Sequence, residues 1–390
     1  YIDNLFLEGK LTPIEVQDFE VDANSWIRSG ISTSGGDDEL RVSRLFDLIK
    51  KGLPTRDARY SDWTSFALKW AELSSLVYCG EHAVYQARLR EMGDTLNTAF
   101  AAWLVDHYSS LMNLPPTNPA MLHHVPRRLV RDMEDSANGQ VALIVVDGLS
   151  LDQWVTVRQI LQKQNVHLMM RESATFAWIP TLTSVSRSIN CTNSEGKLWT
   201  QFWEGQGLSR LDVAYQRGLG DGDAIDILDS VIHPGKTKAV GLVVDKIDKI
   251  MHGMQLGSAG MHNQIKQWCQ GGFLTSLVAQ LLAYGYDVWL TADHGNIQCN
   301  GKGRPLEGGI AETRGERVRI YPSSELRSQV AASFPFAHEW SPIGLPADYF
   351  PLVASGHDAF VNQGVTIVGH GGISIEEVIV PLVKFERRTP

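Results

Sequence analysis

Short apolar runs alternate with helical segments after residue 136, and this alternation constrains the fold more than any other feature of the chain. Most of the runs are rich in Val, Ile and Leu; they span residues 141–146, 169–176, 239–244, 288–291, 318–321 and 378–383. Strands that alternate with helices form a mostly parallel sheet covered by helices. The sequence therefore predicts an α/β fold for residues 137–390.

The first third of the chain has the pattern of amphipathic helices. Residues 61–78 and 95–112 carry aromatic and aliphatic side chains every three or four positions, which places them on one helical face. At residues 12–15, a Thr, a Pro and a Glu occupy the positions that cap and begin a helix. We predict an all-helical N-terminal domain over residues 1–136, joined to the second domain by the proline-rich and charged stretch 114–140.

Length, charge and cysteine content limit the class of protein. The 390 residues exceed the roughly 250–300 at which one hydrophobic core stops growing, which agrees with two domains. A net charge of −9, from 44 acidic and 35 basic residues, argues against a broad basic surface, so DNA binding is not evident. No apolar run approaches the roughly 20 residues of a membrane span, and the four cysteines are scattered. We expect a cytoplasmic protein without membrane contact, and Tyr1 in place of Met indicates a fragment of a longer chain.

Carboxylate and imidazole side chains follow two of the predicted strands directly. Asp147 and Gly148 come after the run 141–146, and the Asp293-His294 pair comes after residues 286–291. Ligands bind at the carboxyl ends of strands in open α/β sheets, and Asp with His suits zinc or manganese. Each motif has a simpler interpretation, a helix cap or a polar turn, when it is taken alone.

A second group of metal-ligand candidates comes from two other segments. Asp248 and His252 are four residues apart, so one helical turn would point both in the same direction. His370 lies between glycines at the end of a further predicted strand. Asp245 competes with Asp248, and His357 competes with His370, as the ligand of this group.

The segment 179–187 contains the candidate nucleophile, because it places hydroxyl residues after a proline at a predicted helix start. The positive field of a helix N-terminus favours an alkoxide and an incoming phosphate. Four hydroxyl residues, Thr181, Thr183, Ser184 and Ser186, compete for this role, and an N-cap is the simpler interpretation. Two divalent cations can activate such an oxygen. We expect Asp147, Asp293, His294 and Thr183 to hold one, and Asp248, His252 and His370 to hold the other.

The order of these motifs resembles that of the alkaline phosphatase superfamily, and within it the PglZ-type domain of bacterial BREX phage-defence systems. The stretches 315–321 and 369–381 are the most PglZ-like, and the resemblance covers about residues 138–386. It implies an alkaline-phosphatase-like sheet, two divalent ions with zinc expected and manganese as the alternative, and Thr183, three residues past Pro180, as the nucleophile. Gly148-Leu149-Ser150 departs from the Arg-Tyr-type sequence that commonly follows the first Asp in PglZ proteins.

These features together predict a metal-dependent phosphoester hydrolase, whose substrate is a phosphoester, a nucleotide being one candidate. The PglZ resemblance implies a role in a bacterial phage-defence system. Phosphodiesters are favoured because no extra cation is evident for a monoester: Lys302 and Arg304 are near Asp293 only in sequence, and Arg187 is equally suited to a helix surface. The alternative is a non-catalytic scaffold that binds other proteins of a defence complex. Its docking face would lie on the helical domain, which contains Trp26, Trp63, Trp70 and Trp103.

Overall fold

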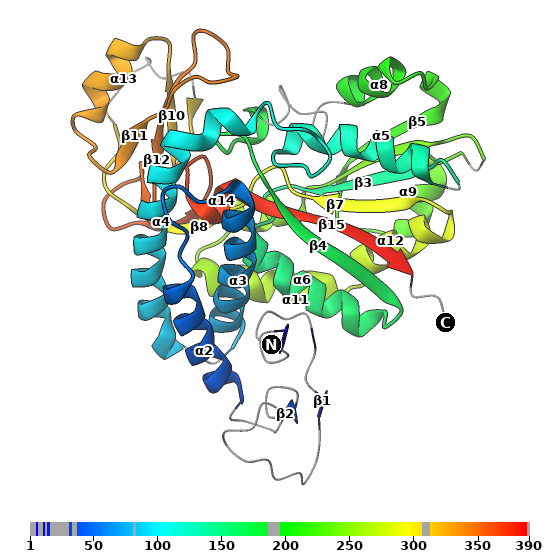
Figure 1. Cartoon of the computed structure of the whole chain (residues 1–390), viewed down its shortest axis with the longest axis horizontal. Coiled ribbons are helices and arrows are strands. Elements are labelled where there is room, and N and C mark those ends of the chain that lie inside the picture. The colour runs from blue at the N-terminus through cyan, green and yellow to red at the C-terminus, as the bar shows by residue number, and fades with distance from the viewer. Residues whose placement is uncertain are drawn as a thin grey trace.

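A six-stranded mixed sheet forms the centre of the protein in the computed structural model (Figure 1). The structure describes residues 5–6, 11, 14–15, 31–32, 37–80, 83–136, 138–185, 196–233, 235–305 and 313–387. In spatial order the strands are β4 (Leu168–Phe176), β15 (Ile379–Arg387), β7 (Asp287–Thr291), β3 (Val141–Val146), β6 (Ala239–Val244) and β5 (Val213–Leu219). The last four pair in parallel, while β15 runs antiparallel to both of its neighbours. The predicted α/β fold with a mostly parallel sheet is therefore confirmed.

Helices cover this sheet because its central strands are apolar on both faces. Every residue of β3 and β6 is buried, as expected for strands with Val, Leu and Ile at successive positions. Three helices that pack on one another, α6 (Leu151–Gln164), α11 (Gly257–Gln270) and α12 (Phe273–Ala283), lie along one side of the sheet. On the other side in Figure 1 are α5 (Val125–Asp135) and α8 (Gly196–Gly205).

The predicted N-terminal helices are present, and they share a hydrophobic core with the rest of the protein. They are α2 (Asp37–Lys51), α3 (Tyr60–Cys79) and α4 (Ala83–Leu111). Their buried residues, Trp63 and Phe100 among them, pack in one cluster with Phe176 and Ile373 from beyond residue 136. Within the expected junction, α5 packs into the core of the sheet instead. The division near residue 136 stays a prediction, but extensive packing joins the two parts.

Two expectations about local structure were wrong. Ile14–Glu15 forms a strand, β1, which pairs in parallel with β2 (Ile31–Ser32), whereas we expected the first turn of a helix there; Thr12 and Pro13 lie outside the described residues. Pairing with β2 provides hydrogen-bond partners for the backbone N–H and C=O groups of β1, and this outweighs the weak local preference for a helix start. The run 318–321 is a strand, as predicted, but it lies outside the central sheet.

Two smaller sheets hold the remaining strands beyond residue 290. An antiparallel sheet has the order β11 (Ala337–Glu339), β12 (Phe350–Ala354), β10 (Val318–Tyr321) and β9 (Thr313–Arg314), with α13 (Ser324–Ala331) beside it. A second has the order β13 (Asp358–Ala359), β8 (Ile297–Gly301) and β14 (Thr366–Gly369). β14 pairs antiparallel with β8, which follows β7 along the chain, and His370 comes directly after β14. Among the helices of the described part, none combines the length and apolarity that crossing a membrane requires.

Candidate metal centre

The candidate ligands gather where parallel strands of the central sheet end. Asp147 directly follows β3, the Asp293-His294 pair comes just after β7, and α10 (Lys246–His252) begins two residues after β6. Because these three strands are adjacent and parallel, their carboxyl ends meet at one edge of the sheet. His370 reaches the same place directly after β14.

Asp147, Asp293 and His294 form the first set, and all three are buried. One candidate ligand atom from each lies within 4.8 Å of the other two. His294 Nε2 is 3.7 Å from Asp147 Oδ1 and 3.5 Å from Asp293 Oδ2. The Gly148 amide donates a hydrogen bond of 3.1 Å to Asp293 Oδ1 and thereby holds this carboxylate in place.

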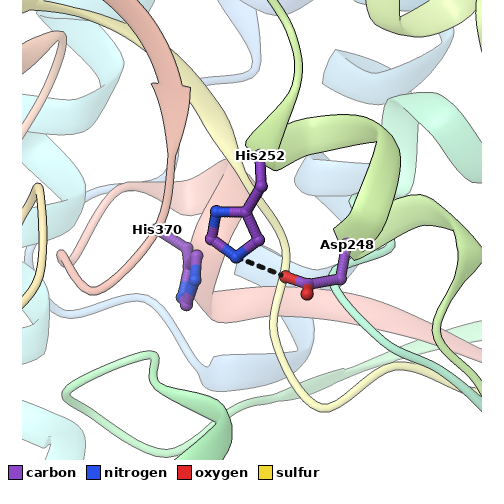
Figure 2. Close-up of side chains that lie close together, drawn as sticks. All are labelled: Asp248, His252 and His370. Carbon is purple, nitrogen blue, oxygen red and sulfur yellow. Dashed lines mark ion pairs between the residues drawn. The ribbon is translucent and has the colours of Figure 1, made fainter.

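Asp248, His252 and His370 form the second set, again with ligand atoms within 4.8 Å of one another. Figure 2 shows Asp248 and His252 reaching from α10 toward each other, with His370 beside the His252 ring. His252 Nε2 lies 3.4 Å from Asp248 Oδ1. This hydrogen bond raises the pKa of His252. His252 is exposed, whereas His370 is buried, so the set is open to solvent on one side.

Backbone carbonyls fix which nitrogen of the two buried imidazoles faces each set. His294 Nδ1 donates to the Gly295 carbonyl at 3.0 Å, and His370 Nδ1 donates to the Thr181 carbonyl at 2.8 Å. A neutral imidazole that donates from Nδ1 carries its lone pair on Nε2. Both rings therefore present a metal-binding nitrogen, oriented by the type of outer hydrogen bond that metal-ligating histidines make.

The electrostatics of the first set favour a bound cation. Burial and the neighbouring Asp293 carboxylate raise the pKa of Asp147 to about 8. Two buried, negatively charged carboxylates without a nearby cation are unfavourable in free energy, and a bound divalent ion would offset this repulsion and desolvation. Together with the oriented imidazoles, this oxygen and nitrogen donor set fits zinc or manganese.

Thr183 completes the site from a different segment. Residues 183–185 are helical, so Thr183 lies at the start of a helical stretch. Its Oγ1 donates to His294 Nε2 at 3.0 Å and lies 3.5 Å from Asp147 Oδ1. Thr181, the competing hydroxyl, is buried and instead donates to the Gly372 carbonyl at 2.9 Å. Ser184 is exposed, and Ser186 lies outside the described residues.

The rival candidates for the second set make other contacts. Asp245 pairs with Lys249 at 2.8 Å, and His357 Nδ1 contacts Asp94 at 2.6 Å on helix α4. Neither belongs to a cluster of metal ligands within the described ranges. Of the cations considered from the sequence, Lys302 pairs with Asp358 at 3.3 Å, and Arg187 lies outside the described residues.

Glu377 and Arg317, which hold the loop that follows His370, were not identified from the sequence. Glu377 accepts hydrogen bonds from the Gly372 amide at 2.8 Å and the Ser374 amide at 3.1 Å. It also pairs with the fully buried Arg317 at 2.7 Å. This arrangement fixes the loop that carries His370. The two residues are 60 positions apart, so no local pattern could have indicated the pair.

Comparison with known proteins agrees with this architecture. Residues 125–189 and 186–385 match the family model described as the BREX system PglZ alkaline phosphatase-like domain. The fold, the clustered ligand candidates and this match define a phosphoesterase of the alkaline phosphatase superfamily, whose members use divalent metals. Within that superfamily, the chain belongs to the PglZ family.

Solved structures give a more distant likeness, and no curated protein matches the sequence. Murine ectonucleotide pyrophosphatase/phosphodiesterase 5 is 12% identical with a TM-score of 0.45, over 63% of this chain and 87% of that chain. Phosphonoacetate hydrolase from Sinorhizobium meliloti 1021, in complex with phosphonoformate, is 11% identical with a TM-score of 0.42, over 63% of this chain and 89% of that chain. At these low values, the similarities assign no role to individual residues.

Proposed function

We propose that this protein hydrolyses phosphoesters, with a preference for diesters, through Thr183 as nucleophile and two divalent metal ions. The observation that carries the proposal is the position of the Thr183 hydroxyl, 3.0 Å from His294 Nε2 and beside the buried Asp147. An alcohol is a weak nucleophile at neutral pH unless its pKa is lowered. The adjoining set of buried ligand candidates is suited to that task.

The residues would divide between two cations. Asp147, Asp293, His294 and Thr183 would hold one, and Asp248, His252 and His370 would hold the other. When bound, the ions would lower the pKa of the attacking hydroxyl and stabilise negative charge on the leaving oxygen. Zinc fits the mixed carboxylate and imidazole donors, and manganese is the alternative.

Thr183 performs the covalent chemistry in this proposal. Its Oγ1 attacks phosphorus and forms a new P–O bond, while the bond from phosphorus to the departing alcohol breaks and that oxygen takes up a proton. A water oxygen then attacks the phosphothreonine, the bond to Oγ1 breaks, and the hydroxyl regains its proton. The sum is one ester bond hydrolysed by one water molecule.

The charges around the site support a preference for diesters. The ionisable groups that act most strongly on the pKa of Asp147 are Asp293, His294 and Asp248, all from the ligand sets themselves. A monoester carries an additional negative charge that an extra cationic side chain would have to offset. Lys302, which is near Asp293 in the sequence, pairs with Asp358.

Membership of the PglZ family supports a role in a bacterial phage-defence system, with other defence proteins as partners. The free thiols of Cys79, Cys269 and Cys299 support a location in the reducing cytoplasm. The scaffold alternative has less support. Trp63, Trp70 and Trp103 are buried, so they offer no docking face, and Trp26 lies outside the described residues.

Hydrolysis of bis-p-nitrophenyl phosphate and p-nitrophenyl phosphate, with zinc, manganese or magnesium added, tests the proposal. Turnover should favour the diester and fall at least about 10³-fold in Thr183→Ala. Ser184→Ala removes the adjacent, exposed hydroxyl and should keep the rate. Equal loss in both variants would refute the role of Thr183. A protein that binds no metal and turns over neither ester would support the scaffold alternative.

A further inference from the structure

A second cluster of reactive side chains lies outside both ligand sets, where α3, α6 and α11 pack together. It joins Cys79 at the end of α3, Asp152 in the first turn of α6 and His262 on α11. The three residues come from widely separated parts of the chain. The proposed hydrolysis uses none of them.

Asp152 holds one side of the His262 ring. His262 Nε2 donates to Asp152 Oδ2 at 3.0 Å, and the other carboxylate oxygen accepts from Ser150 Oγ at 2.5 Å. His262 is 1% exposed, so little solvent competes for this contact. A carboxylate hydrogen-bonded to Nε2 favours the imidazolium form of the ring.

The other ring nitrogen faces a thiol. His262 Nδ1 lies 3.4 Å from Cys79 Sγ and 2.8 Å from Thr156 Oγ1. Thr156 Oγ1 is itself 3.2 Å from Cys79 Sγ, and Ser75 Oγ contacts the same sulfur at 3.8 Å. Cys79 Sγ thus has an imidazole and two hydroxyl groups around it, which are the donors that a thiolate needs.

The pKa values of both His262 and Cys79 favour a proton on the imidazole and a negative charge on the sulfur. Burial would lower the pKa of His262, but hydrogen bonds with Asp152 and Cys79 outweigh it and raise this pKa to about 10. Burial would raise the pKa of Cys79, but the hydrogen bond and charge of His262 outweigh it and lower this pKa. The helix dipole opposes a thiolate at the C-terminal end of α3, so His262 must supply the stabilisation.

We propose that Cys79 is a thiolate paired with the His262 imidazolium and that small electrophiles modify it covalently. Peroxides, represented by hydrogen peroxide, are the class of electrophile that would react with it in the cell. The thiolate sulfur attacks one peroxide oxygen, an S–O bond forms and the O–O bond breaks. The sulfur is oxidised by two electrons to a sulfenic acid, and the released hydroxide takes up a proton as water.

The exposure of the thiols supports a selective reaction at Cys79. Cys79 is exposed as a residue, although its sulfur lies against buried side chains, whereas Cys269 and Cys299 are buried. Burial raises the pKa of Cys269 to about 12 and that of Cys299 to about 11. Cys191 lies outside the described residues. Reactive cysteines combine exposure with a nearby positive charge, and among the described cysteines this combination occurs at Cys79.

Few titratable or hydroxyl groups face the pair from the packed elements. They are Asp152 and Ser150 from α6 and its N-cap, Thr156 from α6, and Ser75 and Tyr78 from α3. Tyr78 stacks on His262 with ring centroids 5.6 Å apart, and its own pKa is raised above the neutral range, chiefly by burial. Arg90 and Glu376 act on Tyr78 from further away. Asp152 and His262 therefore set the charge of the thiol near neutral pH.

The test is the pH dependence of thiol alkylation on the intact protein. Iodoacetamide labelling, followed by mass spectrometry of the Cys79 peptide, should depend much less on pH than labelling of a free thiol, whose reactive thiolate fraction rises roughly tenfold per pH unit below its pKa of about 8.5. A rate at Cys79 that rises tenfold per unit, or labelling no faster than at Cys269, would overturn the proposal.

Variants and a peroxide arm complete the experiment. Asp152→Asn should restore the steep pH dependence at Cys79, and circular dichroism would confirm that the variant is folded; the wild-type profile decides the matter if it is not. After treatment with hydrogen peroxide, a dimedone probe should label the wild type and fail to label Cys79→Ser to the same extent. Alkylation without dimedone labelling at Cys79 would overturn the assignment of peroxide.

Discussion

The imidazole rings of His294 and His370 stack, with centroids 4.0 Å apart and planes 7° from parallel. His294 belongs to the first ligand set and His370 to the second, so the stacked rings lie side by side where the two proposed metal sites adjoin. Burial and the neighbouring His294 lower the pKa of His370, which keeps the ring neutral. A neutral ring is the form that binds a metal.

The division of ligands between the two sets predicts metal content. His252→Ala and His370→Ala should each reduce bound metal from about two ions per chain to about one, because each removes a nitrogen donor from the second set alone. Elemental analysis after dialysis against buffer without added metal gives the number directly.

Two further variants are the controls for that measurement. Asp245→Ala and His357→Ala remove the rival candidates, whose side chains pair with Lys249 and Asp94 instead. Both should keep two metals. Loss of a metal in either, with retention in His252→Ala or His370→Ala, would reassign the ligand.

Metal binding should release a proton from Asp147 at neutral pH. The raised pKa of about 8 leaves this carboxyl mostly protonated at about pH 7 in the metal-free protein, and a cation must displace the proton. Proton release at the first set should therefore approach one per ion near pH 7 and decline as the pH rises through about 8. Calorimetric zinc titrations in buffers of different ionisation enthalpy measure it, in a Thr183→Ala background so that the threonine hydroxyl contributes nothing. Release that is equal at pH 7 and pH 9, or unchanged by Asp147→Asn, would contradict this assignment.

The buried pair behind His370 should matter for both stability and metal affinity. Glu377→Gln leaves the fully buried Arg317 without its carboxylate, and such a loss costs about 3–5 kcal/mol of unfolding free energy. Metal affinity should also fall about 10- to 100-fold, because the loop that holds His370 loses its support. Urea denaturation and zinc titration give the two quantities.

Arg171→Ala is the matched control for that loss. It breaks the pair between Arg171 and Glu386, where the arginine side chain is 73% exposed, and such surface pairs contribute about 0–1 kcal/mol. If Glu377→Gln cost no more than Arg171→Ala, the buried pair would have no special structural role.

The sequence predicted the central sheet, and most of the candidate ligands that the structure brings together were indicated by patterns within a few residues. Asp147 follows an apolar run, and Asp248 and His252 are one helical turn apart, so their environment is encoded locally. The choice between His357 and His370 was not local. It depends on β14 pairing with β8, which brings His370 to the sheet, and on Asp94 of α4, which binds His357.

The shared core of the two predicted domains was likewise invisible in the sequence. Amphipathic periodicity shows that the face of α3 with Trp63 and Trp70 is buried, but it does not show against what. In the structure, Trp70 Nε1 donates to Glu376 Oε1 at 2.8 Å, across 306 positions of the chain. A separate helical bundle and a helical layer on the sheet have the same pattern, so only tertiary structure distinguishes them.

Trp70→Phe should destabilise the protein more than Trp63→Phe. Both residues are buried in the same cluster, and each change removes a similar apolar area. Trp70 also donates to the half-buried Glu376, whereas Trp63 Nε1 has no hydrogen-bond partner among the described residues. Losing a hydrogen bond to a carboxylate costs about 1–3 kcal/mol, so the unfolding free energies of the two variants should differ by roughly that amount. Chemical denaturation of both variants under identical conditions measures the difference.

Because Glu376 lies on α14 (Ile375–Val378), next to Glu377, a weaker metal affinity in Trp70→Phe would show that the N-terminal helices support the metal centre. Equal stabilities would mean that the contact between α3 and α14 contributes packing alone.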